Sequence, residues 1–178
     1  MKERLKRWGS VFAWTTLIYS TLYIVRPICS FLKENIPFSI VANFLLVALF
    51  SAIIFLFLRK VKVRMISTYV LLLLILSMYL FGFMSIKITE EKIHFIEYGI
   101  LVFLVYWASI VDFKDPHSYI IAFFVAFFVG WADEGIQYLL PNRYYDIRDV
   151  VFNGVGSALG LCLIFIMRRE IIQKTPSI

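Results

Sequence analysis

Long hydrophobic stretches make up most of the chain, and short groups of polar residues separate them. These stretches predict six helices, at about 8–26, 38–58, 65–84, 92–111, 117–140 and 149–167. Each approaches the roughly 20 mainly apolar residues that a helix needs to cross a hydrocarbon core of about 30 Å. The pattern therefore predicts an all-α fold, a polytopic bundle of about six transmembrane helices.

The composition agrees with this assignment. Hydrophobic residues account for 61% of the 178 positions, whereas soluble domains contain about 45–50% apolar residues. A water-soluble domain of this size could not bury so much apolar surface. We therefore predict one transmembrane domain over residues 1–178, in a multi-pass membrane protein that contacts membrane lipids.

Lysine and arginine are unequally divided between the two sides of the predicted bundle. Twelve of the eighteen fall on one side: Lys2, Arg4, Lys6, Arg7, Arg59, Lys60, Lys62, Arg64, Lys114, Arg168, Arg169 and Lys174. The other six are Arg26, Lys33, Lys87, Lys92, Arg143 and Arg148. Because basic residues collect on the cytoplasmic side, we expect both termini in the cytoplasm. The net charge of +6 mostly reflects this bias, and no nucleic-acid-binding motif is visible.

Polar residues inside the apolar stretches are concentrated in the second half of the chain. The second and third predicted helices contain no charged residue, and Asn43 is their only strongly polar side chain. We therefore interpret residues 1–85 as a scaffold. Residues 92–160 form the region in which we expect chemistry.

Helical geometry groups these polar residues into three clusters. In the fourth predicted helix, His94, Glu97 and Tyr98 fall within about 100° of arc. In the fifth, an i, i+3, i+4 pattern places Asp133, Glu134 and Gln137 on one face. In the sixth, one stripe contains Asp149, Asn153, Gly156 and Gly160. With both termini inside, all three clusters lie in the outer half of the membrane, below an outer loop that carries Arg143 and Arg148.

A charged side chain at the centre of a membrane helix costs about 2.5–3.5 kcal/mol, so such residues usually pair or line a cavity. Glu97 and Glu134 each lie inside an apolar run, and we expect them to face a shared polar pocket. Asp133 lies near enough to the interface to be an ordinary solvated charge. Asp149 is equally explained as part of a helix cap with Asp146. Gly156 and Gly160 have the spacing of a close helix contact.

Three ordered motifs in this region resemble the VanZ-like membrane protein family. They are KIHFIEYGIL at 92–101, DEGIQYLLPNR at 133–143 and DVVFNGVGSALG at 149–160. The resemblance implies a protein of a bacterial cytoplasmic membrane and a role in reduced susceptibility to the glycopeptide antibiotic teicoplanin. Glycopeptides act on cell-wall precursors outside the membrane, which is the side on which the charge bias places the polar clusters.

Two functions fit a pocket of this kind. In the first, it binds an anionic lipid headgroup, a lipid-linked wall intermediate or the glycopeptide itself, because guanidinium groups bind phosphate and carboxylate bidentately. The candidate ligand-binding residues are Lys92, Gln137, Arg143, Arg148, Asp149 and Asn153. In the second, Glu97 and Glu134 act with His94 as acid and base on a membrane lipid.

Other classes of function have weaker support. Proton-coupled transport would also use membrane acids, but the visible polar path stops in the outer half. The sequence has no serine or cysteine nucleophile motif, and one histidine on the relevant side is a weak basis for a metal site. We therefore predict neither a metal nor another cofactor.

Overall fold

The structure, a computed structural model, describes residues 1–37, 40–41, 43–44, 47–48, 51–52, 54–55, 59, 65–86, 89–141 and 144–172. Its helices with defined bounds are α1 (Lys2–Asn35), α3 (Ile66–Ser85), α4 (Thr89–Ser109), α5 (His117–Leu139) and α6 (Ile147–Ile172). The predicted helix at 38–58 lies partly outside the described residues, and those described within it are helical. The predicted all-α class is confirmed.

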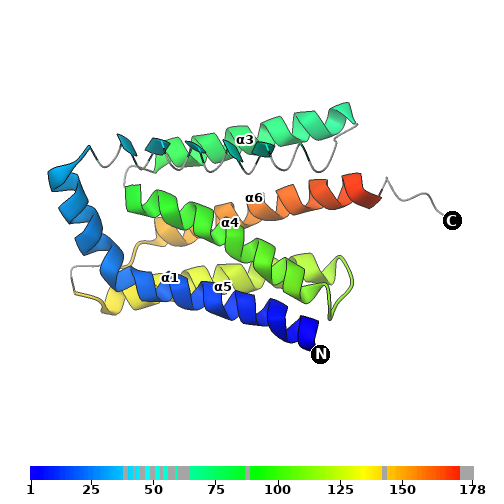
Figure 1. Ribbon diagram of the computed structural model, residues 1–178, viewed down its shortest axis with the longest axis horizontal. Coiled ribbons are helices and arrows are strands. Elements are labelled where there is room, and N and C mark those ends of the chain that lie inside the picture. Colours follow the sequence, from blue (N-terminus) through cyan, green and yellow to red (C-terminus); the bar gives the residue numbers. More distant parts are fainter. Residues whose placement is uncertain are drawn as a thin grey trace.

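Among the described residues, four helical segments are long and apolar enough to cross a membrane, namely Ile66–Ser85, Lys92–Ser109, His117–Leu139 and Ile147–Glu170. Their limits lie within about three residues of those expected from the hydrophobic pattern. The first helix departs furthest, because it runs from Lys2 to Asn35 and has Pro27 in its interior. Proline removes one backbone hydrogen bond and commonly bends a helix, and α1 changes direction along its length (Figure 1).

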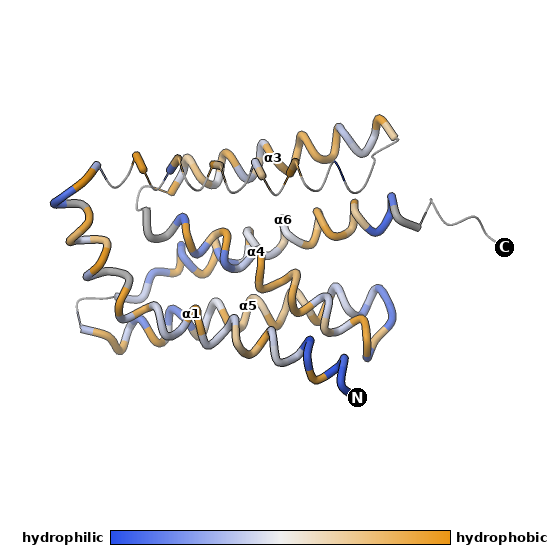
Figure 2. The backbone as a smooth tube through the Cα atoms, viewed as in Figure 1, coloured by the Kyte–Doolittle hydropathy of each residue, from blue (hydrophilic) through white to orange (hydrophobic). Residues whose placement is uncertain are grey.

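The helices run side by side, with α4 in contact with α1, α5 and α6, and α3 packed against α6 (Figure 1). Met1, the turn between α4 and α5 and the last residues of α6 lie at one end, which we call the terminal end. The first residues of α4 and α6 and the last residues of α5 lie at the opposite end, which we call the polar end. Hydrophilic residues gather at both ends (Figure 2).

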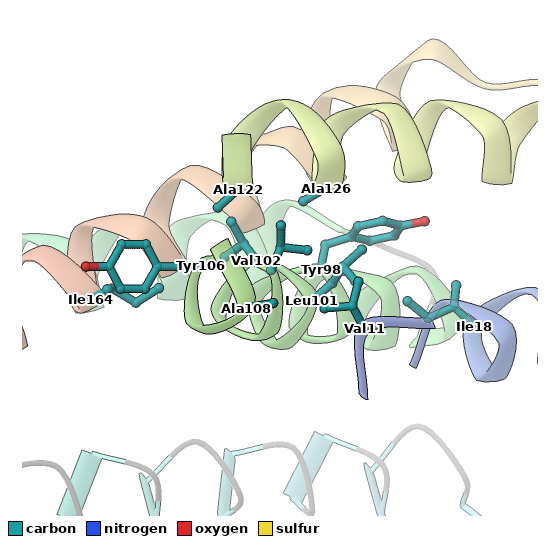
Figure 3. Packing of buried hydrophobic residues seen from close by; sticks show 11 residues of the cluster. Val11, Ile18, Tyr98, Leu101, Val102, Tyr106, Ala108, Ala122, Ala126 and Ile164 are labelled. Carbon is teal, nitrogen blue, oxygen red and sulfur yellow. The ribbon is translucent and has the colours of Figure 1, made fainter. Parts of the chain in front are cut away.

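The apolar core surrounds α4. Its Tyr98, Leu101 and Val102 have no exposed surface. They pack between residues of α1, including Val11 and Ile18, and residues of α5, including Ala122 and Ala126 (Figure 3). This packing fixes the rotation of α4, and therefore the direction in which its polar residues face.

Glycines allow α6 to approach α4 closely. A Cβ atom on Gly156 would lie 2.6 Å from the carbonyl oxygen of Phe95, and one on Gly160 would lie 2.8 Å from Cγ1 of Val102. Real Cβ atoms essentially never come so near another heavy atom. The expected close contact at these two glycines is therefore confirmed.

A polar network joins α1 to α4 at the terminal end. Arg4 Nε lies 2.9 Å from Asp112 Oδ1, and Trp8 Nε1 donates to Asp112 Oδ2 at 3.0 Å. Arg7 donates to the carbonyl oxygen of Trp107 at 2.9 Å. These bonds orient α1, whose Trp14 donates further along to the carbonyl oxygen of Glu97 at 3.1 Å.

Candidate functional site

The centre of the polar end is an imidazole between two carboxylates. His94 Nδ1 lies 3.1 Å from Glu97 Oε2 and 3.6 Å from Asp133 Oδ2. His94 and Glu97 are one turn apart on α4, and Asp133 reaches them from α5. The side chains of His94 and Glu97 are 16% and 19% exposed, whereas that of Asp133 is fully buried. The histidine therefore connects a buried acid to a more accessible one.

The Asp133 carboxylate also lies within hydrogen-bond distance of two neutral donors. Tyr98 Oη donates to Asp133 Oδ2 at 2.9 Å, and Gln137 Nε2 lies 3.5 Å from Oδ1. Gly130, one turn earlier on α5, leaves room for this arrangement, since a Cβ there would lie 3.1 Å from Cε1 of Tyr98 and 3.0 Å from Cβ of Asn153. A buried carboxylate is tolerated only where such donors replace water.

Glu134 shares Gln137 with Asp133 and has a second partner in the α5–α6 connection. Its Oε1 accepts a hydrogen bond from Gln137 Nε2 at 2.9 Å, and its Oε2 accepts one from the backbone N–H of Asp146 at 3.2 Å. Glu134 is 1% exposed. Glu134 therefore links the α5–α6 connection to the end of α5. The acid of α5 that contacts His94 is Asp133.

Asn153 supplies the α6 side of the site. It is 2% exposed, and among the described residues nothing accepts a hydrogen bond from its amide nitrogen Nδ2. A buried donor without an acceptor costs about 1–3 kcal/mol. Asn153 packs against Gly130, so this amide lies beside the α5 polar residues.

The connection into α6 carries the charged rim of the site. Asp146 immediately precedes α6 and accepts a hydrogen bond from the backbone N–H of Arg148 at 2.9 Å, as an N-cap does. Hydrogen bonds from the Arg148 side chain and backbone lower the pKa of Asp146. The Arg148 side chain is 76% exposed and pairs with Asp146. Asp149 lies half-buried in the first turn of α6, while Arg143 lies outside the described residues.

Lys92 faces elsewhere. Its Nζ donates to Asn43 Oδ1 at 3.0 Å and lies 4.6 Å from the centre of the Phe83 ring. Two residues turn a helix by about 200°, so Lys92 and His94 point to different sides of α4. The structure brings Lys92 to the scaffold helices.

Eight of the nine predicted site residues thus lie at the polar end, and all of these except Lys92 belong to the site or its rim, namely His94, Glu97, Glu134, Gln137, Arg148, Asp149 and Asn153. The expectation that Asp133 is an ordinary solvated charge is wrong, because it is completely buried at the centre. Its i, i+4 relation to Gln137 was the signal that could have identified it. Tyr98, one turn beyond His94, belongs to the same group through its hydroxyl.

This arrangement can bind hydrogen-bond donors and can move protons. Its carboxylates accept hydrogen bonds, while His94 can both accept and donate a proton. Within the described part of the chain, no group of three or more His, Cys, Asp or Glu side chains is arranged to hold a metal ion.

Comparison with known proteins gives a family and one relative. An uncharacterised protein of Schizosaccharomyces pombe, C11E3.10, is 29% identical over 108 residues, which are 58% of this chain and 65% of that protein. The chain thus matches somewhat less than two thirds of this relative. No solved structure matches. A family profile described as VanZ/LLP1 matches residues 5–168, from the first helix to the last. The chain therefore belongs to the VanZ/LLP1 family.

Proposed function

We propose that this membrane protein binds an anionic cell-envelope lipid or a lipid-linked wall intermediate at its polar end. The observation that carries the proposal is the convergence of four buried polar side chains from two helices. Asp133, Glu134, Gln137 and Asn153 are 0%, 1%, 4% and 2% exposed. Such residues are costly inside a membrane and usually serve a binding or transport role.

The chemistry of the site indicates what part of a ligand each group would contact. The carboxylates of Asp133 and Glu97 would accept hydrogen bonds from hydroxyl, amide or amine groups. The Asn153 amide would donate to an oxygen, and the exposed guanidinium of Arg148 would bind a phosphate at the rim. A lipid-linked wall intermediate combines phosphate with sugar hydroxyls and amides, so it fits this mixed set better than a simple anion does.

The side of the membrane also supports this class of ligand. The charge bias predicts that the polar end faces the exterior, where wall precursors are exposed and where glycopeptides act. Family membership adds a role in reduced susceptibility to teicoplanin to the proposal. The glycopeptide itself acts on the exterior side of the membrane, so it is a second candidate ligand for this site.

Native mass spectrometry of envelope lipids that co-purify with the protein tests the proposal. We expect Asn153→Leu, which replaces the buried amide group with two methyl groups, and Arg148→Ala to lose a lipid that the wild type retains. Ser157→Ala is the matched control, because Ser157 lies one turn further along α6 and its hydroxyl donates back to the Asn153 carbonyl oxygen within the same helix. Identical lipid profiles in all four proteins would contradict binding at this site.

One contact set favours a second candidate, an acid–base enzyme. His94 lies between Glu97 and Asp133 at 3.1 and 3.6 Å, an arrangement able to take a proton from a substrate and pass it on. In that case Glu97→Gln and Asp133→Asn would retain the lipid but form no product from it. Chromatography of a total lipid extract after incubation with each protein separates the two functions.

A further inference from the structure

A second polar group lies at the terminal end, between the start of α5 and the end of α6. An open cavity of about 770 Å³ is lined there by Asp115, Pro116, Tyr119, Ile120, Phe165, Arg168 and Arg169. We call it the terminal groove. Nothing in the function proposed above uses these residues.

The terminal groove lies at headgroup depth. Asp115 and Pro116 directly precede the apolar span His117–Leu139, and Arg168 and Arg169 fall at the end of the apolar span Ile147–Glu170. The ends of membrane-crossing helices coincide with the polar interface of the bilayer. The groove is therefore open where phosphates of lipids are found.

A hydrogen-bonded pair forms the charged wall of the groove. Arg168 Nη2 donates to Asp115 Oδ2 at 2.8 Å, and Tyr106 Oη donates to Asp115 Oδ1 at 2.9 Å. Asp115 thereby holds Arg168 in place, and its charge is offset by that arginine. Arg169 then leaves the groove with a net positive charge.

The other wall is apolar and exposed. The Tyr119 ring packs on Tyr106 with centroids 4.6 Å apart and meets Phe165 edge-on at 6.4 Å. Phe165 and Ile120 are 55% and 53% exposed. In a membrane-spanning helix these two side chains face hydrocarbon.

From this juxtaposition we propose that the terminal groove binds the phosphate of an anionic phospholipid, with its acyl chain along Ile120 and Phe165. Arginine pairs with phosphate through directed hydrogen bonds. Basic pockets between helices on the cytoplasmic side bind anionic headgroups, and the charge bias places the terminal end on that side. The site is distinct from the polar end, since Asn153 and Arg168 are separated by roughly 22 Å along α6 at 1.5 Å per residue.

Native mass spectrometry of the full-length protein in detergent tests the proposal with two probes, phosphatidylglycerol and phosphatidylcholine of identical acyl chains. We expect the wild type to prefer phosphatidylglycerol, and Arg169→Gln to weaken that binding about fivefold. Lys2→Gln is the matched control, because it removes the same charge at the same end without lining the groove. Arg169→Lys should retain the preference.

Several results would overturn the proposal. One is equal binding of the two lipids by the wild type, and another is an equal loss of phosphatidylglycerol binding in Lys2→Gln and Arg169→Gln. A third is a rise in Tm with sodium phosphate alone that depends on Arg169, because it would indicate a site for free phosphate. Arg169→Gln should leave unchanged the retention of the Asn153-dependent lipid at the polar end. This site and the proposed envelope-lipid site can therefore fail independently.

Discussion

At the scale of single residues, Asp133 shows how a carboxylate is kept inside a membrane bundle. It is fully buried and lies within 3.6 Å of His94 Nδ1, while Tyr98 and Gln137 approach its two oxygens. Each contact replaces part of the hydration that burial removes. The contacts come from α4 and from α5 itself, so the acid depends on the relative position of the two helices.

Tyr98→Phe isolates one of these contacts. The change removes the hydroxyl that donates to Asp133 at 2.9 Å and leaves the ring in the core. We expect the free energy of unfolding to fall by about 1–2 kcal/mol, because the acceptor is a buried carboxylate. Denaturant titration in detergent micelles measures the change. Tyr138→Phe is the control, since Tyr138 is 68% exposed, and an equal loss in both variants would refute a specific role for the Tyr98 hydroxyl.

Asp115 gives a pH-dependent prediction at the same scale. Burial alone would raise the pKa of Asp115, but hydrogen bonds from Arg168 and Tyr106 lower it below its usual 3.8. A carboxyl group whose pKa is lower in the folded than in the unfolded protein stabilises the fold at pH values above its unfolded-state pKa. This stabilisation is lost as the pH falls through its folded-state pKa. Asp115→Asn should therefore lower Tm at neutral pH, and its difference from the wild type should shrink below about pH 4. Thermal denaturation of both proteins at a series of pH values measures this difference in Tm. Glu34→Gln is the control, because Glu34 is exposed. A difference independent of pH would exclude the ionised pair as its cause.

At the scale of helices, the contact between α4 and α6 depends on glycine. A methyl group at Gly156 would meet the backbone oxygen of Phe95 at 2.6 Å, and backbone cannot rotate away as a side chain can. We expect Gly156→Ala to destabilise the protein by about 1–3 kcal/mol. Because α6 carries Asn153, this change should also weaken lipid retention at the polar end.

Gly135→Ala supplies the comparison for Gly156→Ala. Gly135 lies inside α5, and among the described residues, apart from its two chain neighbours and its own helix backbone, no atom lies within 4 Å of the position that a methyl group there would take. Alanine favours a helix over glycine by about 0.5–1 kcal/mol, so this variant should be unchanged or more stable in the same unfolding titration. Similar losses for both glycines would contradict the contact between α4 and α6 as the cause, because helix propensity alone would make both variants more stable.

The helices were predictable from the sequence to a greater extent than the site was. Hydrophobic length alone gave the all-α bundle and the bounds of α3 and α5 to within one or two residues. The same criterion ended the first helix near residue 26, because it stops at charges, whereas α1 continues past Pro27 to Asn35. Charged and interfacial residues keep their backbone hydrogen bonds in a helix, and hydropathy does not record this.

The site residues were predictable as faces of single helices, since residues three and four apart share a face. Which acid of α5 would meet His94 depended on how α5 is rotated against α4, and that rotation is set by Gly130 and by packing around Tyr98. A periodic pattern within one helix contains no such information. Lys92 shows the same limit, because its partners Asn43 and Phe83 come from a part of the chain expected to be only a scaffold.

At the scale of the whole molecule, the two ends have different chemistry. The terminal end contains charged pairs that bridge helices, including Arg4 with Asp112 and Arg168 with Asp115. The polar end contains buried acids and amides. Both proposed lipid sites depend on which end faces the cytoplasm. The terminal groove requires the cytoplasmic leaflet, and the site at the polar end requires the exterior.

Cysteine labelling tests the orientation that both proposals share. In a background with Cys29→Ala and Cys162→Ala, a cysteine replaces either Tyr144, which is 60% exposed in the α5–α6 connection, or Lys114 in the α4–α5 turn. A membrane-impermeant thiol reagent should label Tyr144→Cys in intact cells and Lys114→Cys only after permeabilisation, because basic residues are retained on the cytoplasmic side. The opposite pattern would place the polar end in the cytoplasm. A wall precursor exposed on the exterior or a glycopeptide could not then reach His94 and Asp133, so the exterior ligands of the proposed function would be excluded.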